Sequence, residues 1–158
     1  MAHVADITVI LAALVAFGHF GAFFALTAAL VVQIALLRPS PDLETARRIQ
    51  RADRAYGLMS MLIIVFGFLR VFYFEKGSDF YFNNTFFWIK IGLFVCVGLM
   101  SILPTITYLG WSKEIKQGIS PTFSETDSAK IRKLLHYQLM VIAGVVFCAS
   151  MMAKGFGL

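Results

Sequence analysis

Long apolar runs alternate with short polar segments along the whole chain. The runs lie at about 7–37, 56–74, 86–111 and 134–152. Each is long enough to cross the roughly 30 Å hydrocarbon core of a bilayer as a helix. The pattern therefore predicts four transmembrane helices.

Helix-start signals in the polar segments extend two of these helices. Ser40-Pro41-Asp42 has the pattern of an N-cap, a proline at the first helical position and an early acid. Ser124 to Asp127 has the spacing of a capping box, with Asp in place of the usual Glu. We expect an all-α, up-down four-helix bundle forming one integral membrane domain over 1–158, with helices at about 5–37, 41–74, 85–112 and 125–154.

Composition supports lipid as the main solvent of this chain. Hydrophobic residues make up 59% of 158 residues, sixteen of them Phe, and the mean hydropathy is +0.77. A water-soluble domain of this size could not bury so much apolar surface. Cys96 and Cys148 have neither CxxC nor zinc-like spacing, so neither a disulfide framework nor a structural metal site is indicated.

Basic residues gather in two of the three connections. Segment 38–54 holds five Arg, segment 112–133 holds five Lys or Arg, and segment 75–85 holds one Lys. Because cytoplasmic loops are enriched in Lys and Arg, both basic loops are expected in the cytoplasm and both termini outside. The net charge of +5 is therefore explained by the orientation of the chain in the membrane. We expect the chain to interact with the lipid bilayer and with no nucleic acid.

Each predicted helix carries one nitrogen base near its outer end: His19, Arg70, Lys90 and Lys154. At 1.5 Å per residue they lie about 21–31 Å from the basic-loop ends of their helices. No carboxylate accompanies them within the spans, and the acids expected on that side are Asp6, Glu75 and Asp79. Cations without internal anions need water or an anionic ligand.

These bases suggest a site between the helices. The first and third helices of an up-down bundle lie diagonally across its core, so His19 and Lys90 could meet a metal between them. Arg70 and Lys154 could then pair with carboxylates such as haem propionates. Small residues near His19 are expected to let a flat macrocycle approach; they are Ala16, Gly18 and Ala22.

Other interpretations of the same residues stay open. Arg70, Lys90 and Lys154 could extend their charges to the headgroups, and His19 could be a hydrogen-bonded core residue. The motif [HK]-x-G-x-F occurs at 19–23 and 90–94, which would make His19 and Lys90 counterparts in a duplicated helix pair.

Three motifs carry a family resemblance that covers almost the whole chain. They are R-A-D-R-A-Y-G (51–57), V-F-G-F-L (65–69) and F-W-I-K-I (87–91). They resemble an uncharacterised bacterial four-helix membrane family described as a domain of unknown function. The layout is also similar to the HemJ-type protoporphyrinogen oxidases and to the membrane part of the copper-resistance protein CopD.

The HemJ resemblance implies haem b held by His19 and Lys90, since that group has a His in its first helix and a Lys opening its third. The ending M-A-K-G-F is similar to the group's V-K-P-F and carries over to Lys154. This chain has F-G-A-F-F-A-L-T-A-A-L where that group has Trp-x-Ala-Gly-Leu and Leu-Pro-Arg-Leu, so haem binding is implied more strongly than porphyrinogen oxidation. The seven Met are spread out, which argues against a Met-lined copper path.

The sequence thus predicts a haem b-binding redox protein of a bacterial inner membrane. In this reading His19 and Lys90 are metal ligands, and Arg70 and Lys154 bind the cofactor. The alternatives are a metal-free binder or carrier of a small anion or lipid headgroup, and a structural or assembly subunit. Homo-oligomerisation, a quinone or porphyrin partner and the role of the Arg-rich segment 47–54 are left open.

Overall fold

The structure, a computed structural model, describes residues 2–157, with the backbone alone for residues 2–5. Its elements are α1 (Ala2–Leu36), α2 (Leu43–Leu69), the π-helical turn η1 (Arg70–Phe74), α3 (Ser78–Phe82), α4 (Thr85–Gly110), α5 (Ser112–Lys116) and α6 (Glu125–Ala153). No strand occurs in the described residues. The predicted all-α fold is confirmed.

Four stretches within residues 2–157 are long and apolar enough to cross a membrane. They are Asp6–Leu36, Leu43–Phe74, Thr85–Lys116 and Glu125–Ala153. Side chains on their outer surfaces are large and apolar; Phe17, Phe24 and Leu99 are examples of strongly exposed ones. Lipid tails can cover such a surface without cost, whereas water cannot. The chain is therefore a multi-pass membrane protein.

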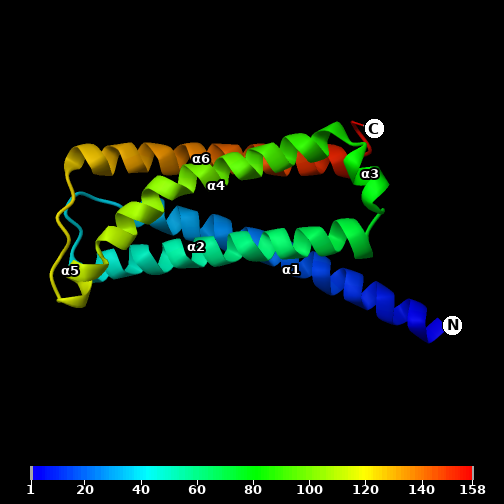
Figure 1. The fold of residues 1–158 in the computed structure, drawn as a ribbon, viewed down its shortest axis with the longest axis horizontal. Coiled ribbons are helices and arrows are strands. Elements are labelled where there is room, and N and C mark those ends of the chain that lie inside the picture. The colour runs from blue at the N-terminus through cyan, green and yellow to red at the C-terminus, as the bar shows by residue number, and fades with distance from the viewer. Residues whose placement is uncertain (1, 158) are drawn as a thin grey trace.

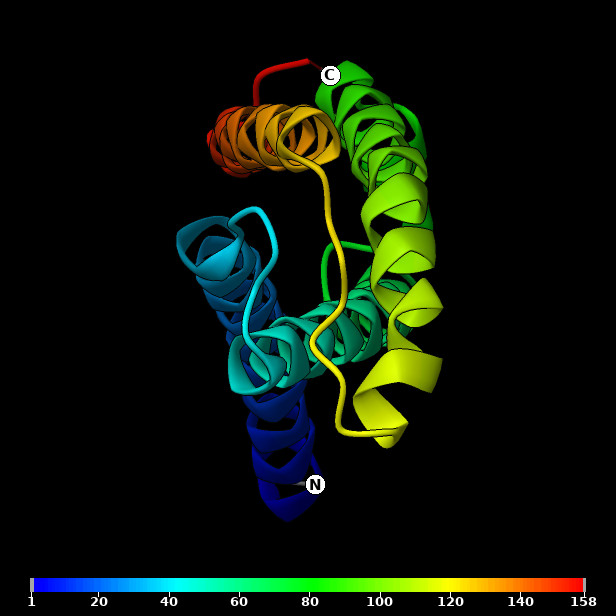
Figure 2. The ribbon, with the colours of Figure 1, turned by 90° about the vertical axis from the view of Figure 1, so that its left-hand side faces the viewer.

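The long helices form an up-down bundle in which neighbours in sequence are neighbours in space. Figure 1 shows α1 beside α2 and α4 beside α6, with α3 and the C-terminus at one end of the bundle and α5 at the other. Seen end-on, the four helices occupy the corners of a quadrilateral (Figure 2). No Cα atoms of α1 and α4 lie within 8 Å of each other in the described residues, nor do any of α2 and α6. The two diagonals of the bundle are thus α1/α4, as predicted, and α2/α6.

The bundle consists of two tightly packed hairpins. The most extensive helix–helix contacts are those of α1 with α2 and of α4 with α6, while α1–α6 and α2–α4 contacts are fewer. Such a division is compatible with a duplicated helix pair, which remains a prediction.

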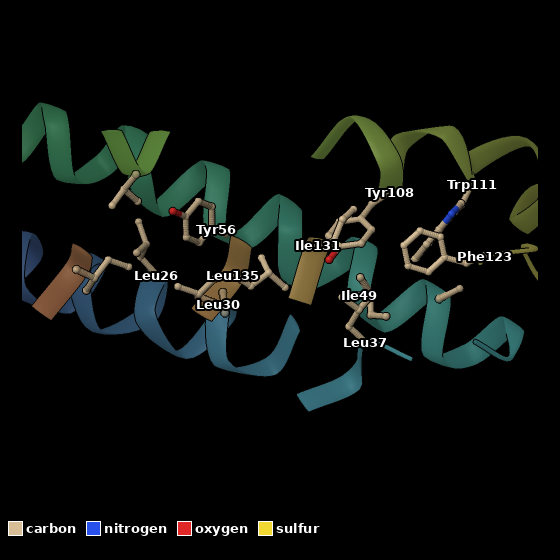
Figure 3. Packing of buried hydrophobic residues seen from close by; sticks show 14 of the residues in the cluster. Leu26, Leu30, Leu37, Ile49, Tyr56, Tyr108, Trp111, Phe123, Ile131 and Leu135 are labelled. Atoms are coloured by element: carbon tan, nitrogen blue, oxygen red, sulfur yellow. The ribbon is translucent and has the colours of Figure 1, made fainter. Parts of the chain in front are cut away.

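Apolar side chains from all the long helices fill the middle of the bundle. Leu26 and Leu30 of α1 meet Ile49 and Tyr56 of α2 and Leu135 of α6 in one cluster (Figure 3). Near the α5 end an aromatic group continues this cluster, with Tyr108, Trp111 and Phe123 packed ring against ring. This core fixes the helices and leaves the polar residues near α3 to form a site of their own.

The start of α2 differs from the prediction. Its N-cap is Asp42, whose carboxylate accepts hydrogen bonds from the backbone N–H of Thr45 (2.9 Å) and from its hydroxyl (2.8 Å). These hydrogen bonds hold the pKa of Asp42 below its ordinary value. Ser40 lies before the helix with φ 45°, so its prediction as N-cap is wrong: the carboxylate two residues later satisfies two donors at once. Ser124 is the N-cap of α6, as predicted.

Candidate functional site

A cavity of about 510 Å³ opens at the α3 end of the bundle. Both hairpins contribute to its wall: His19 and Gly67 come from the first, and Lys90, Val145 and Ala149 from the second. Polar groups therefore share the cavity wall with mainly apolar side chains of α6. Such a mixture suits a ligand that has an apolar body and a few charged groups.

His19 lies where α1 crosses α2. A Cβ atom built on Gly67 would be 3.5 Å from Cε1 of His19 and 3.8 Å from Nδ1, so the imidazole packs directly on the α2 backbone. Nδ1 is buried and has no hydrogen-bond partner among the described residues. A buried, unpaired ring nitrogen is costly, which marks His19 as a residue with an unmet interaction.

Lys90 lines the same cavity from the diagonal helix. Its side chain is half-buried, and Nζ lies 5.2 Å from the ring centre of Phe87, one turn earlier on α4. It is in electrostatic range of His19, Arg70 and Glu75. The structure thus brings His19 and Lys90 to one cavity from opposite corners of the bundle.

Arg70 is not an unpaired cation, because Glu75 lies beside it. The guanidinium donates to Oε1 of Glu75 from Nε (2.8 Å) and from a terminal nitrogen (2.5 Å). Tyr81 donates to Oε2 at 2.8 Å, and the Arg70 guanidinium also lies over the Phe20 ring, 4.9 Å from its centre. Glu75 follows the end of the span at Phe74, on the side where the sequence placed it, but its pairing with Arg70 was not predicted.

These contacts shift the pKa values of Glu75 and of Tyr81, which donates to it. Partial burial raises the pKa of Glu75, but the hydrogen bonds from Arg70 and Tyr81 outweigh it, so the pKa lies below its ordinary value. Burial and the Glu75 carboxylate raise the pKa of the Tyr81 phenol. At neutral pH the group is therefore a guanidinium, a carboxylate and a neutral phenol.

The π-helical turn explains how Arg70 reaches Glu75. In an α-helix residues five apart point to different faces, because each residue turns the chain by 100°. A π-helix closes i→i+5 hydrogen bonds and brings such residues onto one side. The turn Arg70–Phe74 ends α2 in this way, which places Glu75 next to Arg70 at the mouth of the cavity.

Lys154, which was predicted to bind the cofactor, lies outside the cavity wall, whereas Lys76, for which no role was predicted, lies in it. Lys154 is exposed at the C-cap of α6 and is not part of the cavity wall. Lys76 is part of that wall and sits over the ring of Phe80 at 4.4 Å. The sequence signal for Lys76 was its place as the one base in the connection between the second and third spans.

The small residues around His19 serve helix packing in part. A Cβ atom at Gly18 would lie 2.6 Å from Cζ of Phe66, so the ring of Phe66 already occupies the space beside Gly18. Ala22 is buried in the central cluster. The expectation that these residues clear room for a macrocycle on α1 is therefore wrong for Gly18, and the open space lies toward α4 and α6 instead.

The start of α4, which sets the position of Lys90, is fixed by Asn84. This fully buried side chain accepts hydrogen bonds from the N–H groups of Phe86 (2.9 Å) and Phe87 (3.3 Å) through Oδ1. Its Nδ2 donates to the carbonyl of Phe156 at 2.9 Å. The C-terminal turn is thereby tied to the α4 start beside the cavity.

The donor set limits how a metal could be held. Within residues 6–157, whose side chains the structure describes, no three His, Cys, Asp or Glu side chains gather in a group that could bind a metal ion. A metal in this cavity would depend on His19, with Lys90 as second ligand, and on a macrocycle for its remaining bonds.

Fold and cavity together define an α-helical, four-span membrane protein with one mixed polar and apolar site near one end of the bundle. The chain belongs to the family described as "Predicted membrane protein (DUF2214)", whose family model matches residues 11–157. No curated protein and no solved structure matches the chain. Membership of an uncharacterised membrane family is thus confirmed, and the resemblance to the HemJ type and CopD stays a prediction.

Proposed function

We propose that this protein binds haem b in the cavity at the α3 end and works as a membrane redox protein. His19 would bind the haem iron, with Lys90 as second ligand or nearby base. The observation that carries the proposal is that His19 and Lys90, on diagonal helices, line one cavity. Haem b would supply one-electron redox chemistry, with a quinone or porphyrin as the class of partner.

The residues of the cavity fit this group in three respects. The buried Nδ1 of His19 forms no hydrogen bond of normal geometry among the described residues, although the Ile63 backbone interacts with the ring, so this nitrogen retains an unmet interaction. The wall on α6 is apolar and small at Val145 and Ala149, which suits the face of a macrocycle. Arg70 and Lys76 lie at the same cavity and would meet acidic substituents.

For the haem propionates we propose partners that differ from those predicted from the sequence. Arg70 already binds Glu75, so a propionate would have to displace that carboxylate or share the guanidinium with it. Lys154 is outside the cavity wall, whereas Lys76 lies in it. We therefore assign Arg70 and Lys76 to the acidic groups, with Lys154 acting only if the C-terminal turn moves toward the cavity.

Absorbance of the purified protein tests the proposal. The protein is prepared in mild detergent from haem-supplemented cells, and a Soret band is expected that His19→Ala abolishes and Lys90→Ala shifts. His136→Ala is the matched control, since His136 is an exposed imidazole bonded to the Arg132 carbonyl. A colourless preparation, or a band that survives His19→Ala, would rule out this site.

The second candidate is a metal-free binding or carrier protein for a small anion or a lipid headgroup. The charge of the cavity wall favours it: Arg70, Lys76 and Lys90 face a single carboxylate, Glu75, within the wall. A colourless protein whose thermal unfolding midpoint rises with inorganic phosphate, and does not rise in Lys90→Ala, would support this function instead.

We further propose that both termini face outward from a bacterial inner membrane and that the α5 end is cytoplasmic. The support is the concentration of Lys and Arg in 38–54 and 112–133. Single cysteines at Ser78 and Lys116, in a background with both Cys96→Ser and Cys148→Ser, test this in intact cells. A membrane-impermeant maleimide should label the first and not the second; the opposite result inverts the topology.

A further inference from the structure

One face of α2 carries a continuous exposed stripe that changes from arginine to apolar residues. Its positions alternate by four and three residues, which keeps them within about 100° of arc on an α-helix. They are Arg47, Arg51, Arg54, Leu58, Met61, Val65 and Phe68, all exposed. The core face of α2 lies opposite, at Ile49, Tyr56 and Ile63. The same surface that meets lipid tails therefore runs directly into three arginines.

Among the described residues, the three arginines of this stripe form no ion pair and no side-chain hydrogen bond. Among the described residues, the ion pairs of the chain are those of Arg38, Arg48, Arg70 and Lys130. The nearest acids are otherwise engaged: Glu44 binds Arg48, and Asp53 is buried in the bundle, where Thr105 donates to it. Arg47, Arg51 and Arg54 are thus exposed together without an ion-pair partner among the described residues, although Arg54 lies close enough to Asp53 to interact with its charge.

Their depth matches a headgroup layer. Leu58 to Phe68 spans about 15 Å of helix and Phe72 extends it to about 21 Å, so the apolar part of the stripe covers most of the hydrocarbon core. Arg54 lies one turn beyond Leu58, and Arg47 about 10 Å beyond Arg54. Headgroup regions are roughly 5–8 Å thick on each side, which puts Arg54 and Arg51 at the level of the lipid phosphates and the backbone of Arg47 a few Å beyond them, from where its long side chain can reach back.

We propose that Arg47, Arg51 and Arg54 form a binding site for anionic phospholipids, whose acyl chains lie along Leu58, Met61 and Val65 of the same stripe. The planar guanidinium binds phosphate oxygens in pairs, which an ammonium cannot do. An occupant with phosphate and acyl chains matches both halves of the stripe, whereas an acidic protein segment would match only the first. This site is independent of the cavity at the other end of the bundle.

The test compares two variants that lose the same charge. In the stripe variant Arg47, Arg51 and Arg54 are changed to Gln; in the control variant Lys113, Lys116 and Lys130 are changed to Gln. Lys113 and Lys116 are exposed on α5, at the same end of the bundle. The purified proteins are titrated in detergent with phosphatidylglycerol or phosphatidylcholine, and the thermal unfolding midpoint is recorded.

Phosphatidylglycerol should raise the midpoint of the wild type more than phosphatidylcholine does. The stripe variant should lose most of that rise, with an apparent affinity lower by roughly ten-fold or more, and the control variant should keep it. Equal losses in both variants would show a general charge effect and overturn the site. So would a wild type that ignores phosphatidylglycerol but is stabilised by polyglutamate, which would indicate an acidic protein partner.

A more conservative variant keeps the proposal testable if the stripe variant fails to fold. Changing the three arginines to Lys keeps the charge and removes paired donation to phosphate. This variant should respond to phosphatidylglycerol more weakly than the wild type. A response equal to that of the wild type would contradict recognition by guanidinium.

Discussion

Arg70 and Glu75 form a paired contact in which two nitrogens of one guanidinium donate to a single carboxylate oxygen, at 2.8 and 2.5 Å. The other oxygen of Glu75 accepts from Tyr81. Both side chains are about a quarter or less exposed, 21% for Arg70 and 26% for Glu75. Glu75 therefore competes with any acidic group of a ligand for the same guanidinium.

Removing this competitor should strengthen the binding of an acidic ligand. Glu75→Gln frees Arg70, and protoporphyrin IX, with two free carboxylates, should bind about three- to ten-fold more tightly, as expected for a partly exposed ion pair worth ~1 kcal/mol. Absorbance titration measures the affinity. The dimethyl ester of the same porphyrin is the control and should bind the variant and the wild type equally; an equal gain for both porphyrins would contradict the exchange.

The same carboxylate makes stability depend on pH in a definite direction. Because the pKa of Glu75 is below its ordinary value in the folded state, its ionised form stabilises the fold above the unfolded pKa, and this contribution is lost as the pH falls through the folded pKa. The thermal midpoint should therefore drop between about pH 5 and pH 3. The pKa of Asp42 is also lowered, so Asp42 contributes a fall of the midpoint in the same direction. The contribution of Glu75 is therefore the difference between the pH profiles of the wild type and Glu75→Gln. Parallel profiles for the two proteins would contradict it.

Gly18 is required by the close approach of Phe66. A methyl group at Gly18 would lie 2.6 Å from Cζ of that ring, so Gly18→Ala should lower the unfolding free energy by about 1–3 kcal/mol. Gly21→Ala is the control, since nothing lies within 4 Å of its Cβ position. Adding Phe66→Leu to Gly18→Ala should recover much of the loss. If Gly18→Ala behaves like Gly21→Ala, the packing of α1 on α2 differs from that described.

Both Oδ1 and Nδ2 of Asn84 should contribute to the stability of the fold. Asn84→Ala removes the N-cap of α4 and the bond to the Phe156 carbonyl, and should cost about 1–2 kcal/mol. Asn84→Asp keeps the acceptor and loses the donor, so its loss should be smaller. Asn83→Ala is the control; this exposed side chain donates only to the Asp79 carbonyl and should change stability by about 0.5 kcal/mol or less. Chemical denaturation in detergent compares the three, and equal losses at positions 83 and 84 would contradict the bracing role.

The features that depend on hydropathy and spacing could be predicted from the sequence. The four spans follow from apolar length, and the diagonal relation of α1 and α4 follows from short connections between antiparallel helices. Counting residues at 1.5 Å each placed His19, Arg70 and Lys90 at one level, and all three line the cavity. Depth along a straight helix is a property of the chain alone.

The features that depend on local geometry or on a neighbouring helix could not be predicted in this way. The pairing of Arg70 with Glu75 depends on a π-helical turn, and α-helical spacing puts residues five apart on different faces. The partner of Gly18 depends on which α2 side chain faces it, which no pattern on α1 encodes. Lys154 was placed by extending α6 straight through its end, but the helix ends at Ala153 and the chain turns away.

The cavity lies between the two tightly packed hairpins of the bundle. His19 and Arg70 belong to one hairpin, and Lys90 and Val145 to the other, while the contacts between hairpins are sparser than those within them. A molecule bound there would bridge two bodies that are weakly joined by the protein itself. Binding of the ligand would then strengthen the association of the two hairpins, and its release would weaken it. The ligand would act as a reversible crosslink inside the membrane.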